Sequence, residues 1–100
     1  MQLPHDISHY KFWQQLASLP FLDKIYLYGS RARGDNLERS DIDLAICCPN
    51  AKKYDWQKLV YIIDNSDTLL KIDCVNLDNL NDDNQLKQNI LKDGVVLYEK

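Results

Sequence analysis

The spacing of apolar residues predicts short helices and strands that alternate along the chain. Apolar residues recur at helical intervals over residues 6–18 and 54–65 and again at 86, 90 and 91, and each of these segments is predicted to be a helix, the last of which ends before Gly94. Apolar runs between turn signals predict four strands, over 24–28, 41–47, 69–77 and 95–98. A short helix over 30–33 follows the first strand. This order predicts an α/β (α+β) domain with helices packed on a mixed β-sheet.

Residue types at the ends of the predicted helices support their boundaries. Asp6 or Ser8 is available as the N-cap of the first helix, and Pro20 lies just beyond its last apolar position. Gly94 is predicted to end the last helix as its C′ residue, the position at which glycine is most common. Residues 34–39 and 78–84 are polar and predicted to form a loop and a turn.

Length and composition limit what the chain can be. One hundred residues predict a single domain, 1–100, that can bury one modest core. Apolar residues make up 45% of the chain and charged residues 27%, and no apolar run approaches the roughly 18 residues that span a membrane. The first six residues lack the basic start and apolar stretch of a secretory signal. We therefore expect a cytoplasmic protein.

The cysteines and the net charge argue against a cysteine metal site or disulfide and against a nucleic-acid-binding protein. Cys47, Cys48 and Cys74 lack the spacing of metal ligands, and neighbouring cysteines bridge only with strain, so we expect reduced thiols. A net charge of −3 disfavours direct binding of nucleic acid, which requires accumulated lysine and arginine.

Two aspartates at alternate positions are the first candidates for chemistry. Asp41 and Asp43 project from one face of the predicted strand, whereas Ile42, Leu44 and Ile46 project from the other face into the core. Two carboxylates about 6 Å apart, at an effective dielectric constant of about 20, repel each other by about 2–3 kcal/mol. A divalent cation would convert that repulsion into binding.

A third aspartate can join this pair if two predicted strands are neighbours. Asp73 lies between apolar residues in the strand predicted over 69–77. Three carboxylates suit Mg²⁺, which also takes phosphate oxygens as ligands. Two such ions can serve an in-line displacement at phosphorus. Asp78 is the competing third carboxylate, but its predicted position in a turn makes it the weaker candidate.

A glycine and a serine precede the aspartates and are candidates for phosphate binding. Gly29 lets the backbone approach a phosphate because it has no Cβ, and the hydroxyl of Ser30 can add a hydrogen bond. Arg31 or Arg33 can neutralise phosphate charge, although such arginines most often face solvent, and only for Arg33 are the two interpretations equally supported. Each feature alone is ordinary: a Gly-Ser turn, a solvated strand face, a surface aspartate. Their combination at this spacing indicates a triphosphate site beside a metal site.

These residues resemble the signature of a known superfamily. Gly29-Ser30, ten intervening residues and Asp41-Ile42-Asp43 are similar to the motif of polymerase-β-type nucleotidyltransferases, and the segment 29–34 is closest to their minimal nucleotidyltransferase branch. The strand with Asp73 and the ending 90–98 are also similar to that branch. The resemblance covers nearly the whole chain and implies a polymerase-β-like nucleotidyltransferase core.

The resemblance implies a role for each candidate residue. Asp41 and Asp43 would bind two catalytic Mg²⁺ ions, and Asp73 would be the third carboxylate, which binds one ion and helps to activate the acceptor oxygen. Gly29 and Ser30 would hold the triphosphate of ATP, and Arg33 is the candidate for a further phosphate contact. The assignment of Asp73 depends on strand pairing rather than on local spacing.

The resemblance also suggests an acceptor. Members of this branch are commonly antitoxins paired with a helical HEPN-domain toxin, and several are understood to attach AMP to a tyrosine of that toxin. Larger members of the superfamily carry further domains that hold their acceptor, so we expect this domain to take an acceptor surface from such a partner. Two alternatives stay open: a non-catalytic antitoxin that only masks its partner, and an enzyme that modifies a small molecule such as an aminoglycoside with a companion chain.

Overall fold

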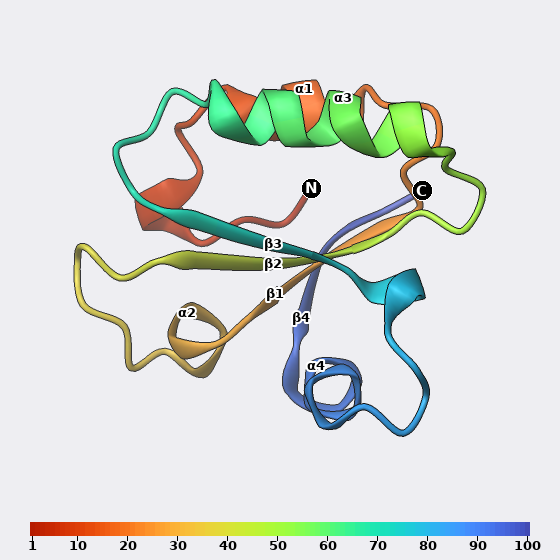
Figure 1. The fold of residues 1–100 in the computed structure, drawn as a ribbon. Coiled ribbons are helices and arrows are strands. Elements are labelled where there is room, and N and C mark those ends of the chain that lie inside the picture. Colours follow the sequence, from red (N-terminus) through yellow and green to blue (C-terminus); the bar gives the residue numbers. More distant parts are fainter.

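A four-stranded mixed sheet forms the centre of the molecule, as expected from the sequence. The computed structural model describes residues 1–100 and has the strand order β3-β2-β1-β4 (Figure 1). Strand β1 (Lys24–Tyr28) pairs antiparallel with β2 (Ile42–Cys47) and with β4 (Val95–Glu99). Strand β3 (Ile72–Asn76) is parallel to β2.

Helices lie on both faces of this sheet. Figure 1 shows α1 (Phe12–Ala17) and α3 (Lys53–Asp64) together on one face, and α2 (Ser30–Arg33) and α4 (Gln85–Asp93) on the other. Two short 3-10 helices, η1 (His5–Ile7) and η2 (Leu77–Asn79), complete the secondary structure. Helix α3 connects the parallel strands β2 and β3, which need a crossover because a tight hairpin can join only antiparallel strands.

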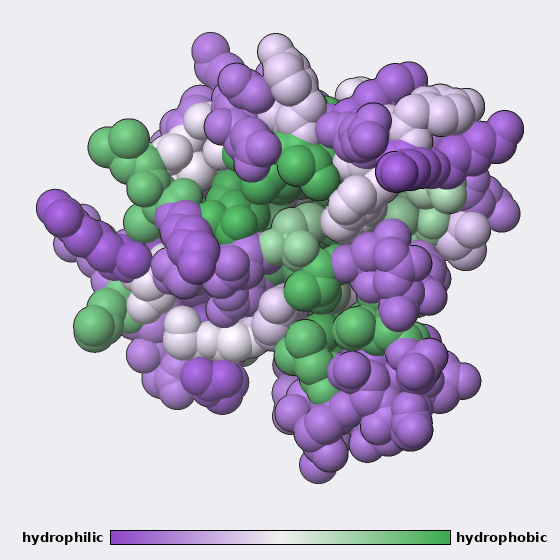
Figure 2. Space-filling model, in the orientation of Figure 1, coloured by the Kyte–Doolittle hydropathy of each residue, from purple (hydrophilic) through white to green (hydrophobic).

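The main core lies between the sheet and the helices α1 and α3. Ile42, Leu44 and Ile46 of β2 are fully buried there, which confirms the alternation predicted for this strand. Figure 2 shows apolar side chains gathered between the upper helical layer and the sheet. The buried cluster has 13 members: Ile7, Phe12, Trp13, Leu16, Leu22, Ile25, Leu27, Ile42, Leu44, Ile46, Cys48, Leu59 and Leu97.

The opposite face of the sheet is packed over a much smaller area. Its buried cluster contains only Ala45, Leu77 and Ile90. Leu77 of η2 and Ile90 of α4 pack with Ala45, which lies in the second half of β2. The beginning of β2 is therefore left without an apolar cover on this face, and polar side chains can stand there in contact with solvent.

The first helix is shorter than predicted. The segment 6–18 instead forms η1 and then α1, whose N-cap is Lys11, and neither Asp6 nor Ser8 caps it. The carboxylate of Asp67 accepts hydrogen bonds from the backbone amides of Lys11 (2.7 Å) and Phe12 (3.1 Å). These bonds lower the pKa of Asp67, and the bond from Lys11 has the largest effect. A residue 56 positions away thus satisfies the free amides at the start of α1.

The bounds of β3 and the backbone conformation of Gly94 also differ from the expectation. Strand β3 spans residues 72–76 rather than 69–77, and Leu69, which precedes it, is fully exposed. Gly94 does follow α4, but its backbone is extended (φ −69°, ψ 152°) rather than left-handed. Its amide donates to the carbonyl of Ile90 at 2.8 Å, and a Cβ on Gly94 would overlap that same carbonyl oxygen. The need for glycine here is steric, not conformational.

The three cysteines are free thiols, as expected. Burial, followed by the charge of Asp78, raises the pKa of Cys48 to about 11. Burial likewise raises the pKa of Cys74 to about 12. None of the helices is long and apolar enough to cross a membrane.

Replacing Gly94 with alanine is predicted to destabilise the fold by about 1–3 kcal/mol, because the new methyl group must displace the carbonyl of Ile90. The free energy of unfolding in urea measures this effect. Lys92→Ala, an exposed change in the same helix, is the control and should alter stability by less than about 0.5 kcal/mol. Equal stability of the Gly94→Ala and Lys92→Ala variants would contradict the steric account.

Cys48 and Cys74 are predicted to resist alkylation in the native protein near neutral pH. The thiolate is the reactive form, and the raised pKa values keep both groups protonated at that pH. Mass spectrometry after iodoacetamide treatment, with and without urea, measures the labelling of each cysteine. Labelling of Cys48 or Cys74 at the same rate in both conditions would contradict this burial.

Candidate functional site

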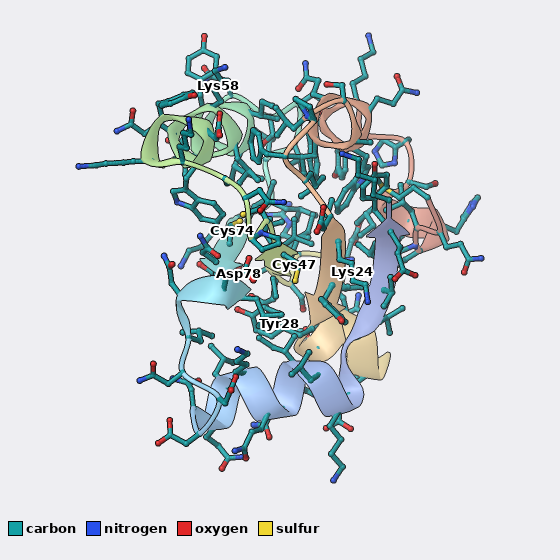
Figure 3. All side chains as sticks on the ribbon, turned by 90° about the vertical axis from the view of Figure 1, so that its right-hand side faces the viewer. Lys24, Tyr28, Cys47, Lys58, Cys74 and Asp78 are labelled. Atoms are coloured by element: carbon teal, nitrogen blue, oxygen red, sulfur yellow. The ribbon has the colours of Figure 1, made fainter.

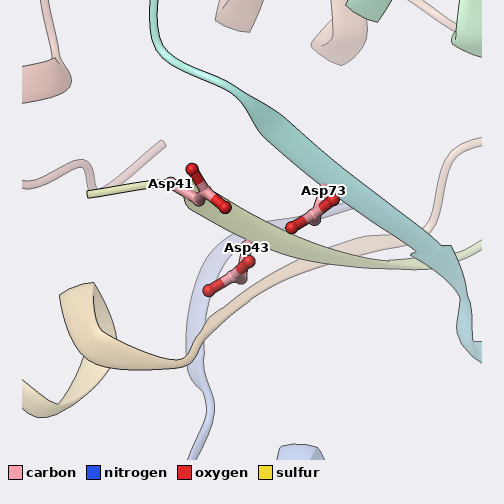
Figure 4. Close-up of side chains that lie close together, drawn as sticks. All are labelled: Asp41, Asp43 and Asp73. Carbon is pink, nitrogen blue, oxygen red and sulfur yellow. The ribbon is translucent and has the colours of Figure 1, made fainter. Parts of the chain in front are cut away.

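Three carboxylates meet on the open face of the sheet. Asp41 directly precedes β2, Asp43 lies within β2, and Asp73 lies within β3. One oxygen of each carboxylate lies within 4.8 Å of an oxygen of the others. Figure 4 shows the three side chains converging from the two neighbouring strands. All three aspartates are partly exposed, so an ion can reach them from solvent.

Strand register explains this convergence. Asp43 and Asp73 are paired residues in the parallel ladder of β2 and β3, where neighbouring strands lie about 5 Å apart. Asp41 precedes Asp43 by two positions, so its side chain emerges on the same face. The condition that the sequence left open, that these two strands are neighbours, is met.

The carboxylates influence one another electrostatically. Partial burial, and then the negative charges of Asp73 and Asp41, raise the pKa of Asp43. Burial, and then the charges of Asp43 and Asp73, raise the pKa of the Tyr28 hydroxyl. Lys71 is the nearby cation, with its Nζ 3.5 Å from a carboxylate oxygen of Asp73. The site therefore carries excess negative charge.

The turn after β1 brings Gly29 and Ser30 to this site. Antiparallel pairing places Tyr28 opposite Asp43, so the next residue of the chain, Gly29, lies beside the Asp43 side chain. Gly29 has φ +76°, and a Cβ built on it would overlap the carboxylate of Asp43. Both the backbone conformation and the close approach require glycine. Ser30 then begins α2.

A cavity of about 310 Å³ adjoins Gly29 between α2 and α4. Tyr28 and Arg33 line it, together with Asn89 and Asp93 of α4. Figure 3 shows Tyr28 on the side of the sheet that faces α4. Arg33 is exposed and forms an ion pair with Asp35, at 3.2 Å. Its side chain therefore lies at the solvent edge of the predicted phosphate site.

Arg31 differs from Arg33 because its side chain is only 2% exposed. Its guanidinium donates to the backbone carbonyls of Glu38 and Ser40 and pairs with Asp6. All of these partners belong to the protein itself. Arg31 therefore makes structural contacts instead of the phosphate contact that the sequence allowed. Sequence reasoning missed this role, because no local pattern links Arg31 to residues 38–40.

Asp78 lies away from the three carboxylates. Its carboxylate accepts a hydrogen bond of 2.7 Å from the amide of Cys48, just beyond the last residue of β2. Asp41 precedes the first residue of that strand, so the two aspartates are separated by the length of the strand, about 20 Å. Figure 3 shows Asp78 close to Cys47, the last residue of β2. The choice of Asp73 over Asp78 is consistent with this arrangement.

The donor set fits a hard divalent cation. Magnesium prefers oxygen ligands, and it commonly takes one or two protein carboxylates together with water and substrate phosphate oxygens. Asp41, Asp43 and Asp73 supply oxygens only, and the Gly29-Ser30 turn lies next to Asp43. The arrangement can hold a metal ion and a phosphate group side by side.

Solved structures with the same fold include proteins of toxin–antitoxin systems. A toxin–antitoxin determined with AMP-PNP matches with 27% identity and a TM-score of 0.60, over 90% of this chain and 69% of that one. A mutant of the toxin–antitoxin MntA–HpeT matches with 25% identity and a TM-score of 0.61, over 90% and 68%. A candidate nucleotidyltransferase from Sulfolobus solfataricus matches with 23% identity and a TM-score of 0.57, over 90% and 76%.

A protein-family model gives the family directly. No curated protein matches the chain. The model described as "Polymerase beta, Nucleotidyltransferase" matches residues 11–100, a span that contains Gly29, Ser30 and all three carboxylates. The resemblance noted in the sequence is thereby confirmed, and the chain belongs to the polymerase beta nucleotidyltransferase family.

Proposed function

We propose that this protein transfers AMP from ATP to a tyrosine of a partner HEPN-domain toxin, and so acts as its antitoxin. The observation that carries the proposal is the meeting of Asp41, Asp43 and Asp73 beside the Gly29-Ser30 turn. The arrangement offers oxygen ligands for a metal ion next to a turn whose glycine allows close approach. Transfer of a nucleotide requires both, because the triphosphate is bound through metal and backbone together.

The three aspartates are the proposed ligands of two Mg²⁺ ions. When bound, the ions would neutralise charge on the triphosphate and favour the deprotonated form of the acceptor hydroxyl. Asp41 and Asp43 would hold both ions, and Asp73 would hold the one nearer the acceptor. The excess negative charge of the site and the raised pKa of Asp43 are consistent with a group of carboxylates that a cation stabilises.

Each residue of the candidate site would have a separate role in an in-line displacement at the α-phosphorus. Gly29 and Ser30 hold the β- and γ-phosphates, with Arg33 at the edge of the site as a further phosphate contact. The phenolic oxygen of the acceptor forms a bond to the α-phosphorus as the bond from that phosphorus to the β-phosphate oxygen breaks. Asp73 accepts the phenolic proton, and pyrophosphate leaves. The products are an AMP-tyrosine ester and pyrophosphate.

Two similarities support this choice of nucleotide and acceptor. The structure determined with AMP-PNP, an ATP analogue, and the MntA–HpeT complex share 27% and 25% identity with this chain, and both are toxin–antitoxin systems. An antitoxin whose carboxylates bind a metal ion would have a chemical means of neutralising its toxin. Catalysis rather than masking therefore becomes the first hypothesis for this chain.

Incubation with ATP and Mg²⁺ is predicted to increase the intact mass of a HEPN protein encoded beside this chain by whole AMP units. The Asp41→Asn, Asp43→Asn double variant should bind the same partner and leave its mass unchanged, because the metal ligands are gone. Mass spectrometry and co-purification measure the two properties separately.

The alternatives predict different results in the same experiment. A masking antitoxin would form the complex without any mass gain, and its double variant would still neutralise the toxin. An enzyme with a small-molecule acceptor would leave the protein mass unchanged and modify hydroxylated compounds such as aminoglycosides. Either pattern would contradict protein adenylylation.

Gly29→Ala is predicted to lower the rate of AMP transfer about 100-fold, because the new methyl group displaces the carboxylate of Asp43. Gly34→Ala is the matched control. Gly34 also has a positive φ, of +83°, but a Cβ there meets nothing within 4 Å. Gly34→Ala therefore controls for a positive φ, and only Gly29→Ala disturbs the site, where the clash with Asp43 adds to the strain of a backbone at ψ −154° rather than 9°. Equal transfer rates in the two variants would show that this close approach has no role in catalysis.

A further inference from the structure

We propose that Arg31 is a positioning residue that fixes Asp41 for metal binding. The proposal rests on the metal site of the proposed function and assigns a role to the only buried charged side chain of the protein. Arg31 does not contact the carboxylates itself. It would act through the backbone that positions the Asp41 carboxylate.

The contacts of Arg31 converge on the segment that leads into Asp41. Its Nε and Nη2 donate to the carbonyl oxygen of Ser40, at 3.2 and 3.0 Å, and Nη2 also donates to the carbonyl of Glu38, at 3.1 Å. That Ser40 carbonyl belongs to the peptide group that joins Ser40 to Asp41. Arg31 therefore holds the peptide plane immediately before the Asp41 Cα.

Asp41 needs such support more than the other two carboxylates do. Asp43 and Asp73 lie inside strands, where the hydrogen bonds of the ladder fix their backbone. Strand β2 begins only at Ile42, whose amide donates to the carbonyl of Lys71 at 2.9 Å. The backbone of Asp41 is thus held by the sheet on its C-terminal side and by Arg31 on its N-terminal side.

The rest of the preceding loop offers little other anchorage. Most residues from 33 to 39 are exposed, and the bonds of Leu37 with Ser40 are internal to the loop. Arg31 connects this loop both to α2, on which it lies, and to η1 through an ion pair of 2.8 Å with Asp6. A lysine cannot replace these contacts, because only the planar guanidinium presents several donors in a fixed fork.

Binding of Mn²⁺, measured by electron paramagnetic resonance or calorimetry, tests this role without relying on catalysis. We expect Arg31→Lys, which keeps the charge, to weaken Mn²⁺ binding about 10-fold, as is typical when the support of a metal ligand is lost. Arg39→Lys is the matched control, since Arg39 lies in the same loop with an exposed side chain and should bind Mn²⁺ like the wild type.

A double-mutant cycle separates positioning from a general structural role. Arg31→Lys should weaken Mn²⁺ binding no further in an Asp41→Asn background, but should still weaken it in an Asp73→Asn background. Equal effects in the two backgrounds would overturn the assignment to Asp41. A thermal melt verifies folding, which we expect to persist because the 13-residue core excludes Arg31.

A second variant makes the test independent of the behaviour of lysine. Arg31→Gln removes the fork as well as the charge, and it should also weaken Mn²⁺ binding by at least about 10-fold. If both Arg31→Lys and Arg31→Gln bind Mn²⁺ as tightly as the wild type, the role of Arg31 is overturned and the proposed function still stands. Failure of the wild type itself to bind Mn²⁺ would overturn the metal site and this role with it.

Discussion

Parallel pairing of β2 with β3 is the constraint on which the site depends. Their register sets Asp43 directly beside Asp73, and no local feature of either strand can do this. The crossover through α3 makes the parallel pairing possible, and α3 also covers the sheet face opposite the carboxylates. Folding therefore brings like charges together, and the electrostatic cost of that step has to be offset by apolar burial elsewhere in the sheet.

One face of the sheet contributes to the apolar core, and the opposite face presents the carboxylates. In β2, residues 42, 44 and 46 belong to the 13-residue core, whereas Asp43 alternates with them on the opposite face. That face is packed only around Ala45, Leu77 and Ile90, so the start of the strand stays accessible. A single strand thus contributes both to the main core and to the candidate metal site, because its side chains alternate.

Most of the candidate site could be predicted from the sequence because most of its residues lie close together along the chain. Asp41, Asp43, Gly29 and Ser30 follow from strand alternation and motif spacing, and the element order predicted a mixed sheet. Two of the features that were missed depend on contacts outside the local pattern, since Asp67 caps α1 from across the molecule and Arg31 holds a loop that no periodicity reveals. The steric need for Gly94 is local, but it depends on the backbone path at the end of α4, which brings the Ile90 carbonyl close. Asp73 was predicted only conditionally, since strand pairing is itself a long-range property.

The most direct test of the account is to locate a bound ion. Anomalous diffraction from crystals grown with Mn²⁺ and a non-hydrolysable ATP analogue would give the position of the metal. We predict at least one Mn²⁺ between Asp41 and Asp43, at about 2.0–2.2 Å from a carboxylate oxygen of each, with the triphosphate against Gly29 and Ser30. Ions bound elsewhere, or a nucleotide bound without metal at these aspartates, would contradict the assignment of the three carboxylates as the metal site.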